Sequence, residues 1–442
     1  MNLKYFFHLY IFFFFVIFPP VKQVLAEGLE PSGFYLLYTG NTFGELKPCG
    51  CAREEDQGGI ERRQAYFKSI RAKSFDVLLL DTGDSFKEPS QQGKIKARYL
   101  LKSMNHMAYD AVALGDKDFI YGQDFLKSNS FIPWVATNMK LPEIPSIPSY
   151  KIISLKDGTK IAILSLAEPD LFYAGPDTGL KLVAPEEVLK KVLPELIREE
   201  NPDLIIAMTH MKKENALALL DSSKLDIIVN GHIEKETDTI DIRPVQRLEK
   251  LFVQAGPRGQ KVGEIFINLE PNGKRTYRHQ MIRLDSHIQF DPEMVELYGN
   301  YNREIEQVFL ETLYARRNKS KIKVYATDAE CKKCHAQAHT IWKNSRHGKA
   351  FATLKSVNKA FDPECLVCHT VGFNQTGGFV SENDSPELKN VQCETCHGPG
   401  LNHAKDPKIE WDGNAAEACM KCHVKNHSPR FNFEEYWSLI KH

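Results

Sequence analysis

The 442-residue sequence has no excess charge of either sign, because 57 lysine and arginine residues balance 57 aspartate and glutamate residues. We therefore expect neither a nucleic acid nor an anionic membrane surface as a partner, since both attract strongly basic proteins. Long apolar runs are also scarce. After residue 26 no run is long enough to cross a bilayer, which argues against a multi-span membrane protein. With 42% hydrophobic and 26% charged residues, the chain has the composition of folded domains, and its length predicts two or three of them.

The first 26 residues have the organisation of a secretory signal peptide. Lys4 precedes an apolar run over residues 5–18, and Val24-Leu25-Ala26 provides a small-residue cleavage site. The run is shorter than the ~20 residues that span a bilayer, so cleavage after Ala26 is favoured over an uncleaved anchor with the same export. We expect a periplasmic or otherwise exported protein in an oxidising compartment.

Short apolar runs alternate with helical patterns over residues 27–285, and several runs end in Gly, Asp or His. This pattern predicts an α/β layered sandwich that carries polar residues at the carboxyl ends of its strands. The predicted strands are Phe34–Tyr38, Val77–Leu80, Ala111–Leu114, Trp134–Ala136, Ile161–Leu166, Leu204–Met208, Ile227–Val229 and Val262–Leu269.

A helical linker is predicted over residues 286–328. Apolar residues recur at three- and four-residue spacing from Met294 to Val308, which indicates an amphipathic helix that packs on the preceding domain. Cys, His, Gly and Pro dominate residues 329–442, so a second, mainly helical and irregular domain is expected there.

Eight of the ten cysteines lie in this last quarter, in four Cys-x-x-Cys-His motifs. This is the attachment pattern of c-type haem, in which two thiols bond to the haem and the adjacent histidine ligates its iron. Two four-cysteine zinc sites are the alternative, but zinc does not need a histidine after every pair. The sequence therefore predicts a tetrahaem cytochrome domain whose apolar core is largely haem, so that folding depends on the cofactor. The motif residues are Cys331, Cys334 and His335; Cys365, Cys368 and His369; Cys393, Cys396 and His397; and Cys419, Cys422 and His423.

A second axial histidine closes a haem for electron transfer, whereas an empty sixth position admits a small molecule. The sequence around the first three motifs, including Trp342-Lys-Asn-Ser-Arg-His347 and His397-Gly-Pro-Gly-Leu-Asn-His403, resembles the tetrahaem cytochromes that accept electrons from hydroxylamine oxidation. The resemblance implies that His347 and His403 are distal ligands and that the haem of His369 is five-coordinate.

In these cytochromes a third distal histidine comes from a C-terminal extension. His427 is our candidate for this role, and His279 or His287 of the first domain is the alternative. His339 lies four residues after His335 and is expected to be a surface residue of the same helix.

The first domain carries five short polar motifs, each directly after an apolar run. They are Asn41-Thr-Phe43-Gly, Asp81-Thr-Gly-Asp84, Gly115-Asp116-Lys117-Asp118, Thr209-His210 and Asn230-Gly-His232-Ile-Glu234. In this order they resemble the calcineurin-like metallophosphoesterase superfamily, in particular periplasmic 5′-nucleotidases and thiosulfohydrolases. The resemblance implies an α/β layered sandwich and two metals that together activate water against a phosphorus or sulfur centre.

One metal's ligands map by this resemblance to Asp84, Asp116, His210 and His232. The second metal's ligands map to Asn41, Phe43, Asp84 and Glu234, where phenylalanine has no donor atom and asparagine is neutral. Lys117 and Ile120 occupy the positions of the catalytic histidine and its aspartate partner. We therefore expect one site of mixed oxygen and nitrogen ligands, suited to Mn, Zn or Fe, or a metal-free scaffold, rather than a two-metal hydrolase.

Cys49 and Cys51 follow the first of these motifs. They are expected to form a disulfide with each other or between molecules, a strained bond that exchanges electrons, or a pair of thiolate ligands.

The chain as a whole is expected to relay electrons to or from a redox partner protein. The alternatives are an oxidoreductase acting on a small nitrogen or sulfur compound at an open haem, and a metal-dependent hydrolase of nucleotides, phosphoesters or S-sulfonates.

Overall fold

The computed structural model describes residues 33–48, 56–87, 89–172, 179–234, 242–270, 273–410, 415–425 and 427–442. Residues Gly33–His442 form one unit of contacting elements. The predicted signal peptide and the Cys49/Cys51 pair lie outside the described residues. Within the described ranges, no helix is both long and apolar enough to cross a membrane.

Two β-sheets form the core of the N-terminal part, with the strand orders β13-β12-β1-β2-β3 and β10-β11-β9-β8-β6-β5. Strands β1, β2 and β3 run parallel, as do β6, β8, β9 and β11, so the carboxyl ends of neighbouring strands meet at one edge of each sheet. The strands are Phe34–Thr39 (β1), Asp76–Asp81 (β2), Ala111–Val112 (β3), Tyr150–Ser154 (β5), Lys160–Ala167 (β6), Leu204–His210 (β8), Ile227–Asn230 (β9), Val245–Arg247 (β10), Lys250–Gln254 (β11), Lys261–Leu269 (β12) and Arg275–Arg283 (β13), with a separate pair of Met139–Lys140 (β4) and Lys181–Leu182 (β7).

Side chains along each central strand alternate between two apolar layers. Leu36 and Tyr38 of β1 belong to the core between the sheets, whereas Leu37 packs toward the helices. In β6, Ile163 likewise faces the other sheet and Leu164 faces the helices on its outer side. Because both faces are covered, these strands are continuous apolar runs, as the sequence indicates.

Helices cover the outer face of each sheet. Near the first sheet lie Ile60–Arg71 (α1), Gln91–Met107 (α2) and Pro292–Glu311 (α6), and beside the second lie Pro185–Glu200 (α4) and Lys213–Ser222 (α5), with the short Gln123–Lys127 (α3) between β3 and β4. Helix α6 packs on α1 and α2 through Met294, Tyr301 and Ile305, which confirms the predicted amphipathic helix. The layers are therefore helix, sheet, sheet and helix, which confirms the predicted α/β layered sandwich.

One predicted strand is wrong. The run Trp134–Ala136 forms only a single bridge, between Val112 and Trp134. The backbone amide of Ala136 donates to the Pro148 carbonyl instead of extending the sheet. The run is apolar because it is buried, and burial alone does not specify a strand.

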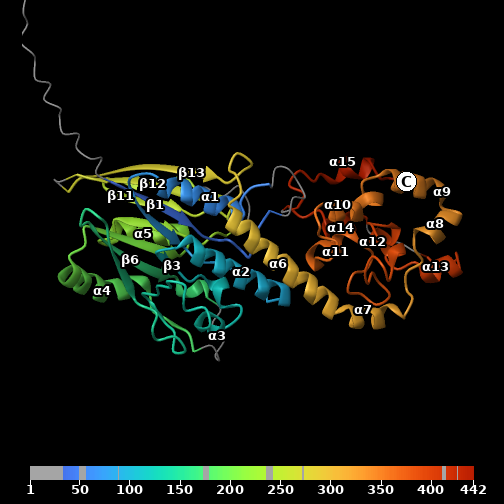
Figure 1. Ribbon diagram of the computed structural model, residues 1–442, viewed down its shortest axis with the longest axis horizontal. Coiled ribbons are helices and arrows are strands. Elements are labelled where there is room, and N and C mark those ends of the chain that lie inside the picture. The colour runs from blue at the N-terminus through green and yellow to red at the C-terminus, as the bar shows by residue number, and fades with distance from the viewer. Residues whose placement is uncertain are drawn as a thin grey trace, which may run out of the picture. The chain divides into compact units, whose positions relative to one another are not determined.

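The C-terminal part consists of short helices and irregular loops (Figure 1). They are Leu313–Ser320 (α7), Asp328–Cys334 (α8), Ala336–Asn344 (α9), Ala350–Ser356 (α10), Pro363–His369 (α11), Cys393–His397 (α12), Leu401–Lys405 (α13), Ala415–Met420 (α14) and Phe433–Ser438 (α15). Its buried apolar side chains, among them Phe351, Leu366 and Phe379, lie before residue 401 in the described ranges. From residue 401 onward, none of the described side chains is buried.

Asp362 joins α11 to helix α2 of the N-terminal part. Its Oδ1 accepts hydrogen bonds from Gln92 Nε2 at 2.8 Å and from the Glu364 amide at 3.1 Å, and its Oδ2 accepts one from Lys359 Nζ at 2.9 Å. Burial opposes ionisation of this carboxyl, but Lys359 and Gln92 outweigh it and lower the pKa of Asp362. The charged form is therefore favoured by folding.

Replacement of Asp362 with alanine is expected to lower the free energy of unfolding by about 2–3 kcal/mol, because a helix cap is lost and Lys359 loses its buried partner. Since the folded pKa of Asp362 is lowered, this stabilisation is present above pH ~4, near the pKa of an unfolded aspartate, and is lost as pH falls further. Denaturant unfolding of the two proteins at pH 7 and pH 3 measures both effects. Asp384→Ala, which removes a partly exposed ion pair with Arg317, is the control and should cost less. Equal losses for the two variants would contradict this role.

Candidate functional site

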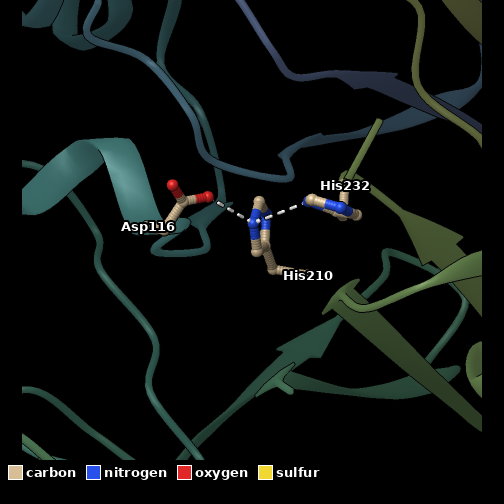
Figure 2. Close-up of side chains that lie close together, drawn as sticks. All are labelled: Asp116, His210 and His232. Carbon is tan, nitrogen blue, oxygen red and sulfur yellow. Dashed lines mark hydrogen bonds and ion pairs between the residues drawn. The ribbon is translucent and has the colours of Figure 1, made fainter. Parts of the chain in front are cut away.

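The polar motifs of the N-terminal part gather at the carboxyl ends of the parallel strands. Asp84 follows β2, Asp116 follows β3, His210 ends β8 and His232 follows β9. Figure 2 shows Asp116, His210 and His232 turned toward one another. The carboxyl ends of the parallel strands of both sheets thus bring together residues that are far apart in the sequence.

Asp116, His210 and His232 form a compact cluster of potential ligands. His210 Nε2 lies 2.8 Å from Asp116 Oδ1 and 3.3 Å from His232 Nδ1, and all three donor atoms fall within 4.8 Å of one another. Ligand atoms about 2 Å from a tetrahedral zinc are roughly 3.3 Å apart, so this cluster has the spacing of a metal site.

The protonation states of the cluster also suit a metal. Burial opposes ionisation of Asp116, but the hydrogen bond and charge of His210 outweigh it and lower the pKa of this carboxyl. Burial and the charge of His210 lower the pKa of His232, which favours the neutral imidazole that binds metals. Two imidazole nitrogens and one carboxylate suit Zn, Mn or Fe.

The other half of the predicted site is occupied by a lysine. Lys117 Nζ lies 3.2 Å from Asp84 Oδ2, and the Lys117 amide donates to Asp84 Oδ1 at 3.1 Å. The same ammonium group lies 4.9 Å from the centre of the Phe43 ring. A fixed positive charge therefore contacts Asp84, the residue that the resemblance assigns as the bridging ligand.

Asn41 and Glu234, the remaining predicted ligands, lie differently. Asn41 is fully buried, its Nδ2 donates to the Gly231 carbonyl at 2.6 Å, and its Oδ1 has no hydrogen-bond partner among the described residues. Asn41, Phe43 and Asp84 all have positive φ angles of 50–55°, a strained conformation that clusters at functional sites. Glu234 is exposed and lies outside the three-residue cluster.

Asp118 is a residue of this site that the sequence reasoning did not single out. Its carboxylate accepts hydrogen bonds from the backbone amides of Asp84, Ser85 and Gly115 at 2.8–2.9 Å. Burial and the charge of Asp84 raise the pKa of Asp118 to about 7. Because it ties the loop after β2 to the loop after β3, Asp118 fixes the separation of Asp84 and Asp116. The signal in the sequence was a second acid two residues after Asp116.

Each haem-attachment motif of the C-terminal part lies on a short helix or immediately after one. The first spans the end of α8, the second and third are contained in α11 and α12, and the fourth begins in α14. All eight cysteines are free of disulfides. Cys331 of the first motif is hydrogen-bonded to Cys393 of the third, and Cys422 of the fourth to Cys368 of the second. Helix α12, which contains the third motif, packs on α14, where the fourth begins. The attachment points therefore follow one another in the order first, third, fourth and second.

Three of the four motif histidines face a second imidazole. Ring centroids are 6.2 Å apart for His335 and His403, 6.0 Å for His423 and His347, and 5.9 Å for His397 and His442. Two imidazoles that ligate one iron have centroids roughly 6 Å apart, because each nitrogen lies about 2 Å from the metal. The residues present therefore fit bis-histidine haems at these three motifs.

His369, the histidine of the second motif, has a different environment. Its Nδ1 lies 2.7 Å from the Ala350 carbonyl, which leaves Nε2 available to a metal. Among the described residues, no second imidazole makes a ring contact with it. The hydroxyl of Thr353 lies 3.5 Å from Nδ1, on the side of the ring that faces away from a bound metal.

The other candidate histidines have separate roles. His279 Nε2 is hydrogen-bonded to the Tyr38 hydroxyl at 2.8 Å, and His287 is exposed beside Asp285. His427 makes no ring contact with a motif histidine among the described residues. The prediction of a surface position for His339 is wrong, because its side chain is buried on α9 and its Nε2 lies 3.0 Å from Asp328 Oδ2.

Comparison with known proteins identifies both parts. A family model described as "Cytochrome c554 and c-prime" matches residues 330–398. Cytochrome c-554 of Nitrosomonas europaea is 37% identical over 92 residues, which cover 17% of this chain and 39% of the relative. Trifunctional nucleotide phosphoesterase protein YfkN of Bacillus subtilis is 25% identical over 290 residues, which cover 56% of this chain and 20% of the relative.

A solved structure of a 5′-nucleotidase precursor from Thermus thermophilus superposes with a TM-score of 0.54 at 23% identity, covering 62% of this chain and 59% of that one. The chain thus spans less than two thirds of each of these relatives. It combines an α/β fold of the 5′-nucleotidase and calcineurin-like phosphoesterase type with a C-terminal cytochrome c554 domain, which implies covalently bound haem.

Proposed function

We propose that the protein is an exported tetrahaem cytochrome that relays electrons between a redox partner protein and a second carrier or enzyme. The observation that carries this proposal is the set of three imidazole pairs at 5.9–6.2 Å, since two axial histidines close a haem to ligands and leave it suited to electron transfer. Export is supported by the apolar N-terminal run of the sequence and by c-type attachment, which belongs to compartments outside the cytoplasm.

The order of the attachment points supports a relay with two ends. The first motif stands at one end and the second at the other, with the third and fourth between them. The second motif is also fastened directly to the N-terminal part, because Glu364 pairs with Lys96 and Asp362 with Gln92, both on α2. We propose that the redox partner docks near the first motif and that the N-terminal part meets the relay at the second.

The N-terminal part is proposed to hold one divalent metal, not two. Asp116, His210 and His232 supply one ligand set, whereas Lys117 and Phe43 fill the space beside Asp84 with a positive charge and a ring that has no donor atom. A cation already present beside Asp84 disfavours a second metal there, because like charges repel in a poorly solvated site. A two-metal hydrolytic mechanism is therefore not proposed.

Redox titration of the purified holoprotein tests the relay. We expect four covalently bound haems by pyridine haemochrome assay, all of which are reduced and reoxidised reversibly. The ferric protein should show three low-spin haems by electron paramagnetic resonance. The His403→Ala variant is expected to convert one of them to high spin without loss of haem, because it removes the imidazole opposite His335. The relay would be disproved if a protein electron donor could not reduce the four haems, or if the cysteines bound zinc instead of haem.

A second candidate function is favoured by the environment of His369, which has no imidazole opposite it among the described residues. This haem would then bind a small nitrogen or sulfur compound at an open sixth position. We expect the wild-type ferric protein to show one high-spin haem and to bind one nitric oxide per chain. A protein whose haems are all low-spin and inert to nitric oxide would leave electron transfer as the function.

A further inference from the structure

We propose that His442 is the sixth ligand of the haem held by Cys393, Cys396 and His397, because its imidazole lies against His397 at 5.9 Å with Nε2 available to a metal. This inference rests on the proposed haem attachment and assigns a ligand to one haem of that set. His442 was not among the ligands that the sequence predicted.

The distance matches the two pairs that contain the distal ligands implied by the sequence resemblance. The centroid separation of His397 and His442 differs by only a few tenths of an ångström from those of His335 with His403 and of His423 with His347. The ring planes of His397 and His442 are inclined by 59°, which is compatible with a shared metal because each ring can rotate about its own metal–nitrogen bond. Three separate histidine pairs at the same spacing indicate the same arrangement, with two imidazoles placed to ligate one iron.

The orientation of His442 leaves the correct nitrogen available. Its Nδ1 lies 3.0 Å from the Ile440 carbonyl, a group that accepts but cannot donate, so Nδ1 carries the hydrogen and Nε2 keeps its lone pair. His369 and His403 are oriented in the same way, with Nδ1 against the carbonyls of Ala350 and Ile409 at 2.7 Å and 2.8 Å. An N–H bond to a backbone carbonyl is the usual second partner of a metal-bound histidine.

A capped helix and a hydrogen-bonded turn precede His442. Asn432 caps helix α15 by accepting the Glu435 amide at 3.1 Å. After the helix, the amides of Ile440 and Lys441 both donate to the Trp437 carbonyl at 3.1 Å and 2.8 Å, which turns the chain back. These hydrogen bonds fix the backbone from Asn432 to Lys441, and the backbone in turn determines where the imidazole of His442 lies.

The same segment contacts the fourth motif. Phe431 stacks on His423 with centroids 4.7 Å apart and planes 13° from parallel, and Tyr436 meets the same ring edge-on at 5.5 Å. Residues 431–442 therefore connect two neighbouring motif histidines. We infer that this segment fastens the third and fourth haems together, with His442 as the metal ligand and Phe431 as the packing contact.

His427, the residue that the sequence favoured for this role, lies among other groups. The charges that act on it belong to Glu364 of α11 and to Glu45, Lys87 and Arg258 of the N-terminal part. None of these belongs to the third motif. His427 is therefore the matched control: a histidine of the same C-terminal region that the structure does not place against a haem-attachment histidine.

The test compares the His442→Ala and His427→Ala variants of the full-length holoprotein, purified without a C-terminal tag. We expect both to keep four haems, and only His442→Ala to convert one low-spin ferric haem to high spin and to bind one more nitric oxide per chain. Added imidazole should restore the low-spin signal. Unchanged spin states in His442→Ala, or conversion in His427→Ala alone, would overturn the assignment.

The His442→Met variant decides the case if His442→Ala does not mature. Methionine keeps six-coordination but raises the reduction potential of the haem it ligates. We expect one of the four haems to shift to higher potential and to show a methionine-to-iron charge-transfer band. If His442→Met is spectroscopically identical to wild type, His442 is not a ligand. Failure of the proposed function gives a different result, because the wild-type protein would then lack four reducible haems.

Discussion

The His210→Ala variant is expected to lose the divalent metal of the N-terminal part while keeping the iron of its haems. His210 stands between the other two ligands, with its Nε2 2.8 Å from Asp116 Oδ1 and 3.3 Å from His232 Nδ1. Without it, two donors remain, and one of them is His232, whose pKa is lowered by burial and by the charge of His210. We expect metal affinity to fall at least ~100-fold, since loss of even an outer-shell partner costs about 10–100-fold.

Elemental analysis of the purified holoprotein measures this loss directly. The wild-type protein should contain the haem iron and one further ion per chain, and His210→Ala should contain the haem iron alone. His279→Ala is the control, because His279 belongs to the same part of the chain but bonds to the Tyr38 hydroxyl and lies outside the cluster. Haem absorbance shows that the C-terminal part remains intact. A further ion that survives in His210→Ala, or is absent from wild type, would show that the cluster is not a metal site.

The geometry around Asp84 explains why the sequence alone left the metal number open. The replacement of two expected ligands by Asn41 and Phe43 is visible in the sequence, but the contact of Lys117 Nζ with Asp84 is not. Lys117 follows Asp116 directly in the chain, yet its ammonium reaches the loop after β2 because the neighbouring Asp118 carboxylate holds that loop by hydrogen bonds. Only the folded arrangement shows that a cation already contacts the Asp84 carboxylate.

Local patterns in the sequence predict most of the fold. The central strands are continuous apolar runs because both of their faces are covered, and α6 shows helical periodicity because only one of its faces is buried. Strands β4, β5, β7, β10, β11 and β13 were not among the predicted runs, although β11 is buried. The outer strand β13 was missed because its pattern differs from that of the central strands. Its polar and half-buried side chains alternate on an edge of the sheet, and such a strand is hard to distinguish from a loop by hydrophobicity.

The haem ligands likewise divide into those that a local sequence pattern predicts and those that it does not. The attachment residues are predictable because a Cys-x-x-Cys-His motif places all three groups within five residues. Axial partners come from distant segments, so His347 and His403 were found only through resemblance and His442 was not found. His339 was expected on the surface because its spacing from His335 suggested one continuous helix, whereas α8 ends before His335 and Asp328 draws His339 inward.

The segment after residue 401 has no apolar core of its own. None of its described side chains is buried, and the rings of Phe431, Tyr436 and His442 lie against motif histidines. A segment with no fully buried apolar side chain offsets little of the conformational entropy that ordering costs, at about 1–2 kcal/mol per residue for the backbone alone. We therefore expect its order to depend on bound haem.

The double variant Cys419→Ala/Cys422→Ala is therefore expected to lose the fourth haem and the order of residues 415–442 together. Limited proteolysis should cut this segment at least ~10-fold faster than in wild type, because bound haem no longer stabilises the ordered segment against local unfolding. The equivalent change at the second motif, Cys365→Ala/Cys368→Ala, is the matched comparison, because that motif contains the fully buried Leu366 and is fastened to α2 through Asp362. We expect its segment to stay resistant to protease after losing one haem. Equal resistance of both double variants would mean that the C-terminal segment is ordered by its own contacts, and equal sensitivity would mean that every motif depends on its haem to the same extent.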